Sequence, residues 1–154
     1  MRPDLLSPVS FLRVRRNLAI ADLGDLVELP LVAVLATRRA DKSVLLSPVW
    51  HEYRDGGFNV CTSHNDVKVR HLRRDPTAAL VLAESLPPYR GVELTTDPSF
   101  NGDDVIGTVT RIAVRYLGSD AGLAYAASAP DDIVIRLEPG RVRAWDFADA
   151  AAQG

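Results

Sequence analysis

What the sequence has little of excludes several kinds of protein. It contains a single cysteine, Cys61, which cannot form an intramolecular disulfide or a cysteine-rich metal site. No apolar run approaches the roughly 20 residues that a membrane-spanning helix needs. The N-terminus lacks the charged-then-apolar order of a secretory signal peptide. These absences predict a cytoplasmic protein without a membrane partner.

The charged residues show no excess of one sign. With 18 Lys and Arg against 20 Asp and Glu, the formal net charge is −2, so the chain lacks the basic field that drives nucleic-acid binding. Hydrophobic residues make up 47% of the 154 residues, which is enough to bury one core. We therefore expect a single domain over residues 1–154 that binds no nucleic acid.

Motifs of common catalytic sites are also missing. The histidines at 51, 64 and 71 lack metal-ligand spacing, no Ser-His-Asp arrangement can be defined, and the glycines form no phosphate loop. We predict no metal site. Cys61 lies in an apolar segment and is expected to be an inert buried thiol. For His51 two roles stay open, a proton donor and an exposed or hydrogen-bonded structural histidine, and the second is favoured.

The hydrophobic pattern predicts a mainly β protein with a few helices. Helical spacing predicts helices over 10–27 (capped by Ser10), 63–74 (capped by Ser63 or Asn65) and 103–117 (capped by Asp103). Strand formers predict strands over 31–37, 44–53, 58–62, 77–83 and 89–96, and a last pair of strands, 133–137 and 142–145. Pro48 cannot donate to a sheet ladder, which predicts an edge, a bulge or an opening there. The sum is an antiparallel barrel of about six strands with two or three flanking helices.

Residues 62–76, TSHNDVKVRHLRRDP, bring hydroxyl groups and cations to the start of a predicted helix. Free N–H groups at a helix start attract anions, and Lys68 and Arg70 add full positive charge. A phosphate-bearing cofactor would fit this pattern. The alternative is a solvated basic helix face, since Arg73 and Arg74 continue the run.

The segment Leu46-Ser47-Pro48-Val49-Trp50 is the second informative pattern. Because Pro48 interrupts the ladder, neighbouring backbone groups are free to contact the polar edge of a heteroaromatic ring, and Trp50 supplies an apolar wall. The alternative is an edge strand that carries a core tryptophan.

These motifs, in their order and spacing, resemble the FMN-binding split-barrel superfamily, which includes the pyridoxamine 5′-phosphate oxidases. The likeness is carried by LAT (35–37), SPVW (47–50), the double-glycine turn (56–57), K-x-R-x-L-R-R-D-P (68–76) and IVIRLEPGRVRAWDF (133–147). It covers most of residues 11–147. Within the superfamily the chain is most similar to the flavin/deazaflavin-dependent oxidoreductases, many of which use coenzyme F420. The resemblance implies a split barrel.

The resemblance also implies an oxidoreductase that uses bound F420, with FMN as the alternative, to transfer hydride to a small conjugated organic substrate. Ser47, Pro48, Val49 and Trp50 would line the cofactor ring, Thr62 and Ser63 would lie near the ribityl chain and phosphate, and Lys68 and Arg70 would hold the phosphate. The family's site lies at a homodimer interface. Tyr89 or Trp145 would therefore come from the second subunit.

Three positions depart from the pattern of the deazaflavin-binding relatives. Asp66 replaces a basic residue of some relatives, and its carboxylate would repel a phosphate. His71 stands where asparagine is common, and residues 92–96 lack the usual glycine. Two alternatives to the F420 enzyme stay open: an FMN-dependent oxidase or reductase of the same fold, and a binding protein for a flavin, haem or other tetrapyrrole without turnover.

Overall fold

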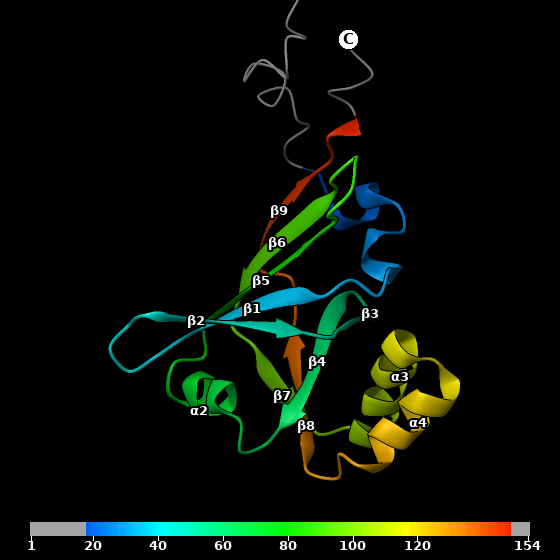
Figure 1. The fold of residues 1–154 in the computed structure, drawn as a ribbon. Coiled ribbons are helices and arrows are strands. Elements are labelled where there is room, and N and C mark those ends of the chain that lie inside the picture. Colours follow the sequence, from blue (N-terminus) through cyan, green and yellow to red (C-terminus); the bar gives the residue numbers. More distant parts are fainter. Residues whose placement is uncertain (1–17, 149–154) are drawn as a thin grey trace, which may run out of the picture.

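The computed structural model describes residues 18–148, which form two sheets with helices at both sides (Figure 1). The elements in chain order are η1 (Ile20–Leu23), η2 (Leu26–Glu28), β1 (Ala33–Arg38), β2 (Val44–Val49), β3 (Glu52–Arg54), β4 (Gly57–Ser63), α2 (Val67–Arg74), β5 (Ala78–Ala83), β6 (Gly91–Thr96), β7 (Ser99–Asn101), α3 (Val105–Leu117), α4 (Ser119–Ala127), β8 (Asp132–Leu137) and β9 (Arg141–Trp145).

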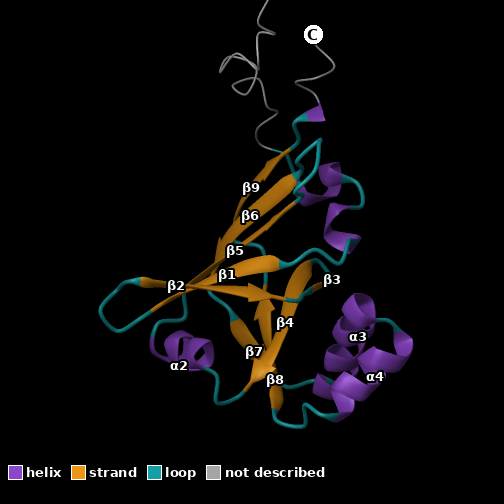
Figure 2. Ribbon diagram, viewed as in Figure 1, coloured by secondary structure: helices purple, strands orange, loops and turns teal. Residues whose placement is uncertain are grey.

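Every strand pair is antiparallel, in a five-stranded sheet of order β2-β1-β5-β6-β9 and a four-stranded sheet of order β3-β4-β8-β7. Figure 2 shows α2 on one side of the four-stranded sheet and the α3–α4 pair on the other. The inner faces of the two sheets share one core, which includes Leu35, Phe58, Leu80, Ile135 and Leu137. The predicted class, a mainly β split barrel with flanking helices, is confirmed.

Alternation of side chains along β1 shows how the sheets enclose this core. Ala33, Leu35 and Thr37 point inward and are at most 1% exposed, whereas Val34 and Ala36 face outward and are half-buried. Period-two alternation of this kind is what a strand with one covered face produces. The outward row of β1 is therefore covered only in part.

The predicted strand over 44–53 is in fact two strands in different sheets. β2 is the edge strand of the five-stranded sheet and carries Pro48, so the prediction of an edge at this proline is confirmed. The chain then crosses at Trp50 and His51, and β3 begins the four-stranded sheet at Glu52. A proline near the end of an edge strand costs no ladder bond, which explains why the strand tolerates it.

The helices α2 and α3 both begin later in the chain than their predicted caps. Asp66, not Ser63 or Asn65, caps α2, and Asp104, not Asp103, caps α3. In α2 the inward residues are Val69 and Leu72, whereas Val67 is 41% exposed. Aspartate is among the best N-cap residues, and each of these side chains reaches a backbone N–H of the first turn.

Three further predictions differ from the structure. β8 and β9 do not form a hairpin with each other: β8 pairs with β4 and β7, and β9 pairs with β6. The elements β7 and α4 had not been predicted. Of the helix expected over 10–27, residues 10–17 lie outside the described part, and residues 18–27 contain 3-10 turns interrupted by Gly24, which has a positive φ of 61°. No helix within residues 18–148 is both long and apolar enough to cross a bilayer.

Candidate functional site

A closed polar cluster lies where β4 leads into α2. The Lys68 ammonium is 2.9 Å from Asp66 Oδ2 and 3.5 Å from the Thr62 hydroxyl oxygen. Asp66 Oδ1 also accepts the Lys68 backbone N–H at 2.9 Å. The cluster is partly buried, because the Lys68 side chain is only 13% exposed. The structure thus brings together two of the predicted phosphate ligands, Thr62 and Lys68, and adds the carboxylate that the sequence marked as a departure.

The other two predicted phosphate ligands are close in sequence but lie apart from this cluster. Ser63 is exposed, and its hydroxyl accepts the Asn65 N–H at 3.4 Å. Arg70 is exposed and makes no ion pair with any described residue. Residues two apart on a helix point to different sides, so Lys68 and Arg70 do not converge on one point.

The SPVW segment presents a backbone edge. Among the strands of residues 18–148, β2 pairs only with β1, so the backbone groups on its other side have no partner strand in this part of the chain. Pro48 is exposed and Ser47 half-buried, whereas the Val49 side chain is 8% exposed and belongs to the core. A ring placed beside this strand would meet the backbone of residues 47–50 and the proline ring, but not the valine side chain.

Trp50 ends this edge in an aromatic cluster. Its ring stacks on Tyr116 of α3 with a centroid distance of 5.0 Å and an interplanar angle of 9°, and Tyr125 of α4 lies tilted at 5.4 Å. The Tyr116 hydroxyl donates to the Leu31 carbonyl at 2.7 Å. Trp50 is therefore held in a fixed position by the α3–α4 pair, and Tyr125, which is 44% exposed, extends the aromatic surface outward.

Beside this cluster, His51 is fully buried, with a relative exposure of 0%. Among residues 18–148, neither ring nitrogen has a hydrogen-bond partner at normal distance and angle. Burial, with a smaller contribution from the Arg115 charge, lowers the pKa of His51 to about 4, so the ring is neutral at physiological pH. The favoured prediction of an exposed or hydrogen-bonded histidine is wrong.

Two further kinds of reactive group were considered for the site: the Cys61 thiol and a metal-binding cluster. Burial raises the pKa of the half-buried Cys61 thiol to about 12, in agreement with an inert cysteine. In residues 18–148 no group of His, Cys, Asp or Glu side chains is arranged to bind a metal ion.

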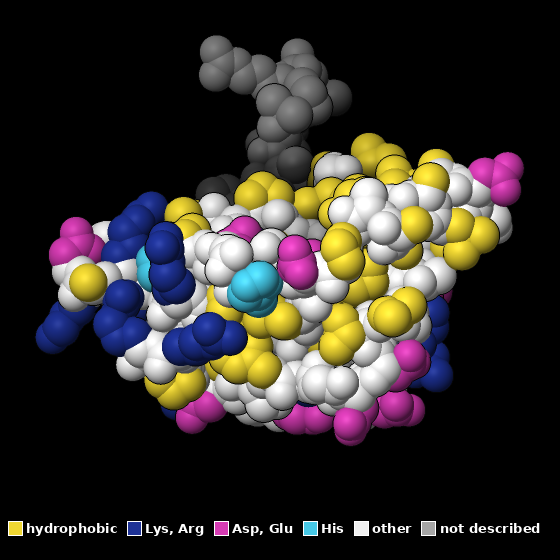
Figure 3. All heavy atoms as spheres, turned by 90° about the horizontal axis from the view of Figure 1, so that it is seen from below, with side chains coloured by type: hydrophobic (Ala, Val, Ile, Leu, Met, Phe, Trp, Pro, Cys, Tyr) yellow, Lys and Arg dark blue, Asp and Glu magenta, His cyan; other side chains and the backbone are white. Residues whose placement is uncertain are grey.

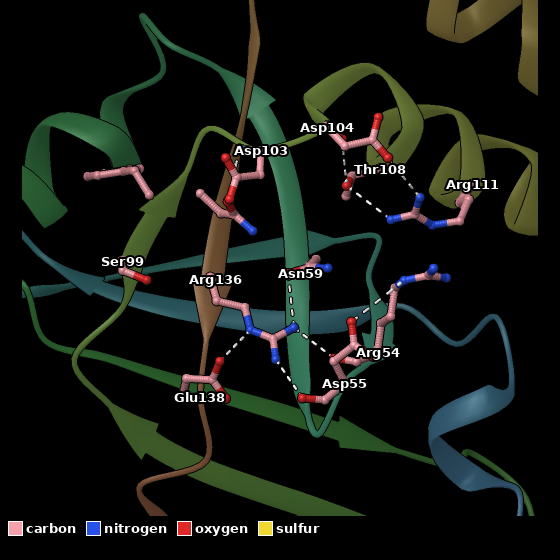
Figure 4. Close-up of a pocket in the computed structure, with 12 residues that line it drawn as sticks. Arg54, Asp55, Asn59, Ser99, Asp103, Asp104, Thr108, Arg111, Arg136 and Glu138 are labelled. Atoms are coloured by element: carbon pink, nitrogen blue, oxygen red, sulfur yellow. Dashed lines mark hydrogen bonds and ion pairs between the residues drawn. The ribbon is translucent and has the colours of Figure 1, made fainter.

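A polar cleft of about 470 Å³ opens on the outer face of the four-stranded sheet, between β3, β4, β7, β8 and the start of α3 (Figure 4). Its floor is a hydrogen-bonded network. Arg111 donates to both oxygens of Glu52 at 3.0 and 2.9 Å, Asn59 donates to Glu52 at 2.9 Å, and Arg136 donates to Glu138 at 2.7 Å. None of the eight predicted cofactor residues lines this cleft.

The residues proposed to come from a second subunit lie near the β6–β9 end of the molecule. Trp145 packs directly over Gly91, where any Cβ would overlap its ring, and the Arg143 guanidinium lies 4.9 Å from the ring centroid. Tyr89 has a positive φ of 55° and contacts Phe147 edge-on at 6.3 Å.

Sequence reasoning missed two parts of this geometry. The stack of Trp50 on Tyr116 joins residues far apart in sequence, and no local pattern marks them as partners. The polar cleft depends on the pairing of Asn59 with Arg136 across β4 and β8, which requires the strand register. The alternation of polar and apolar residues along each strand was the available signal.

Two antiparallel sheets, an edge strand beside an aromatic cluster, and a helix start with a lysine define a split barrel of the flavin-binding class. The chain belongs to the pyridoxamine 5′-phosphate oxidase family, whose profile matches residues 21–146.

Solved structures share the fold. The conserved hypothetical protein Rv2991 from Mycobacterium tuberculosis has a TM-score of 0.73 and 22% identity, covering 87% of this chain and 88% of that one. An F420 reductase has a TM-score of 0.63 and 20% identity, covering 77% and 93%. HutZ, a haem storage protein from Vibrio cholerae, has a TM-score of 0.65 and 15% identity, covering 82% and 94%. No curated protein sequence matches the chain.

Proposed function

We propose that this protein is a cytoplasmic oxidoreductase that binds the deazaflavin F420 and transfers hydride to a small conjugated organic substrate. The observation that carries the proposal is the free edge of β2, which ends at the stacked Trp50. A planar ring with carbonyl and N–H groups can hydrogen-bond to such an edge and pack against the tryptophan. The family and the F420 reductase that shares the fold support the choice of cofactor.

The residues present offer contacts for such a group at both of its ends, and at the phosphate end the group would share the Lys68 donors with Asp66 or displace it. The backbone of Ser47, Pro48 and Val49 would hold the ring, with Trp50 as its wall. Thr62, Ser63 and Lys68 would take the ribityl and phosphate part, and Arg70 would approach from the exposed helix face. When bound, the cofactor supplies the hydride chemistry. The protein's own residues then bind, orient and exclude water, which agrees with the absence of a nucleophile arrangement among residues 18–148.

The outer face of the five-stranded sheet supports a homodimer with the cofactor at its interface. Leu46 is 63% and Val44 51% exposed on β2. Leu46 lies across from Ala36, and Pro48 across from Val34, so the apolar residues continue over β1. No helix in the described part of the chain covers this patch (Figure 1). A second copy of the chain is the occupant we propose, because an apolar face next to a cofactor edge favours a permanent partner.

Two other functions have some support. An FMN-dependent oxidase or reductase would use the same residues, and the family of pyridoxamine 5′-phosphate oxidases favours it. A tetrapyrrole-binding protein without turnover is favoured by the fold shared with HutZ.

A side-by-side fluorescence titration of the purified protein with F420 and FMN tests the proposal. We expect micromolar binding of F420 and weaker binding of FMN. Lys68→Ala with Arg70→Ala should weaken F420 binding by more than about tenfold, because two cations are lost. The double variant Arg73→Ala with Arg74→Ala, from the same helix, is the matched control and should bind normally. Stronger binding of FMN supports the flavin enzyme, and binding of haem alone supports the carrier.

A further inference from the structure

Asp66 already holds the groups that a phosphate would use at the start of α2. Its carboxylate accepts the Lys68 backbone N–H at 2.9 Å and pairs with the Lys68 ammonium at 2.9 Å. The Thr62 hydroxyl lies 3.5 Å from the same ammonium. Ammonium and helix N–H are thus both bound to one internal anion, and the hydroxyl lies beside them. An incoming phosphate has to share these donors with Asp66 or displace it.

The carboxylate is charged at neutral pH. Burial alone would raise its pKa, but the hydrogen bonds and the charge of Lys68 outweigh burial and hold the pKa of Asp66 below its usual value. The Asp66 side chain is 29% exposed and that of Lys68 only 13%, so their charges are screened less than those of a surface pair. The local charge of the pair is zero.

This neutral pair distinguishes between ligands by phosphate charge. A phosphate monoester carries a charge of about −1.5 to −2 at pH 7. A phosphate diester, joined to two alcohols, carries one negative charge. Repulsion from a fixed carboxylate grows with ligand charge, so Asp66 penalises the monoester about twice as much as the diester.

We propose that Asp66 is a specificity-determining residue that selects a cofactor with a phosphate diester, as in F420, over one with a monoester, as in FMN. The proposal rests on the proposed function, because it concerns the same site. It turns the residue that departs from the relatives' pattern into the source of the preference.

Further anionic groups of the ligand would meet cations outside the pair. Arg70 on α2 and Arg39 on the β1–β2 turn have no carboxylate partner within residues 18–148. Figure 3 shows Lys and Arg side chains gathered on this side of the molecule. The penalty from Asp66 is therefore local to the phosphate and does not extend to charges elsewhere on the cofactor.

The variant Asp66→Asn tests the proposal, because asparagine has the same size and also caps helices. We expect it to bind FMN about tenfold more tightly and F420 about threefold more tightly than the natural protein, since only the repulsion is lost. Asp75→Asn, which removes a carboxylate at the other end of α2, is the matched control and should change neither affinity. Thermal melting confirms that both variants fold.

A second measurement separates this inference from the function. Millimolar inorganic phosphate should shift the amide NMR signals of residues 62 and 68 in Asp66→Asn, but not in the natural protein. If this holds while neither cofactor binds, the proposed function fails and Asp66 remains the occupant of the anion site. Unchanged affinities in Asp66→Asn, an equal change in Asp75→Asn, or equal phosphate binding by the natural protein would overturn the role of Asp66.

Discussion

Two α-helices of this molecule begin on an aspartate, and their surroundings differ. At α2, Asp66 pairs with Lys68, and that lysine has no other carboxylate partner among residues 18–148. At α3, Asp104 lies 3.5 Å from Arg111, but Arg111 is already held through two hydrogen bonds by the buried Glu52. The first cation has one exchangeable partner, and the second is fixed by a carboxylate that is only 8% exposed.

The difference separates the proposed anion site at α2 from the structural brace at α3, which is the ion pair between Arg111 and Glu52. A ligand can compete for Lys68 by replacing one partly exposed carboxylate. Competing for Arg111 would leave Glu52 buried without its counter-charge, which is costly. The two charged sites are therefore not equivalent: in the polar cleft beside α3, Arg111 and Arg136 are each held by a carboxylate of the fold.

The largest effect on stability should come from acid, through protonation of His51 beside α3. His51 donates its backbone N–H to the Tyr116 hydroxyl of α3, and the pKa of its ring falls from 6.5 to about 4 on burial. Because the unfolded chain binds this proton more tightly, stability is full above pH 6.5 and is lost as the pH falls to 4, by about 3 kcal/mol. Urea denaturation between pH 7 and 4 measures it.

A matched pair of variants isolates this effect from that of the carboxylates. His51→Leu should flatten the pH profile, whereas substitution of the exposed histidine in His64→Leu should leave it as steep as in the natural protein. Parallel profiles for all three proteins would show that His51 does not carry the acid sensitivity.

A smaller loss of stability should follow when the ion pair between Glu52 and Arg111 is removed. Glu52→Gln removes the charge that faces Arg111 and keeps the oxygen that accepts from Asn59. Since the Arg111 side chain is 35% exposed, we expect a loss of about 2 kcal/mol rather than the full cost of a buried charge. Glu138→Gln breaks the more exposed pair with Arg136 and should cost under about 0.5 kcal/mol. Equal losses in urea melts would contradict the comparison.

Loss of the α3 cap should have the next largest effect. Asp104 has a positive φ of 49° and accepts the Gly107 N–H at 3.1 Å. Asp104→Ala removes this hydrogen bond and leaves alanine in a left-handed conformation, so we expect a loss of about 1 kcal/mol. Asp104→Asn keeps both properties and should melt within a degree or two of the natural protein. A stable alanine variant would show that the cap contributes nothing.

The smallest effect on stability is expected at the N-terminus of α2. Asp66→Asn retains the cap and loses a partly exposed ion pair, so the free energy of unfolding should change by less than about 0.5 kcal/mol. Chemical denaturation at pH 7 checks this value. A large loss would mean that Asp66 is also a structural brace and that the two helix starts are alike.

Much of the fold could be predicted from the sequence because its strands alternate strongly and its turns carry clear signals. The pattern of β1 and the Asp55-Gly56-Gly57 turn give strand and turn almost where the structure has them. The partners of β8 and β9 could not be predicted, because a short Pro-Gly link looks like a hairpin whichever sheet each strand joins. The helix α4 was missed because its alanine-rich sequence has little apolar periodicity.

The candidate site was predicted in part. Lys68 and Thr62 do meet, as their positions at a strand end and a helix start suggested. The pairing of Asp66 with Lys68 could not be predicted from their spacing, because the N-cap of α2 was expected earlier in the chain. The environment of Trp50 and His51 depends on how α3 lies across the sheet, and no local pattern encodes that packing.

The two tryptophans stand at separate places, one stacked on Tyr116 and the other lying over Gly91. Trp50 adjoins the proposed ring site, and Trp145 lies on the last strand of the other sheet edge. The molecule therefore carries two tryptophan fluorophores that report on different regions of the structure. Replacing either one by phenylalanine would leave a single reporter, so that quenching at the ring site and rearrangement at the β9 edge could be followed separately, without attaching a dye.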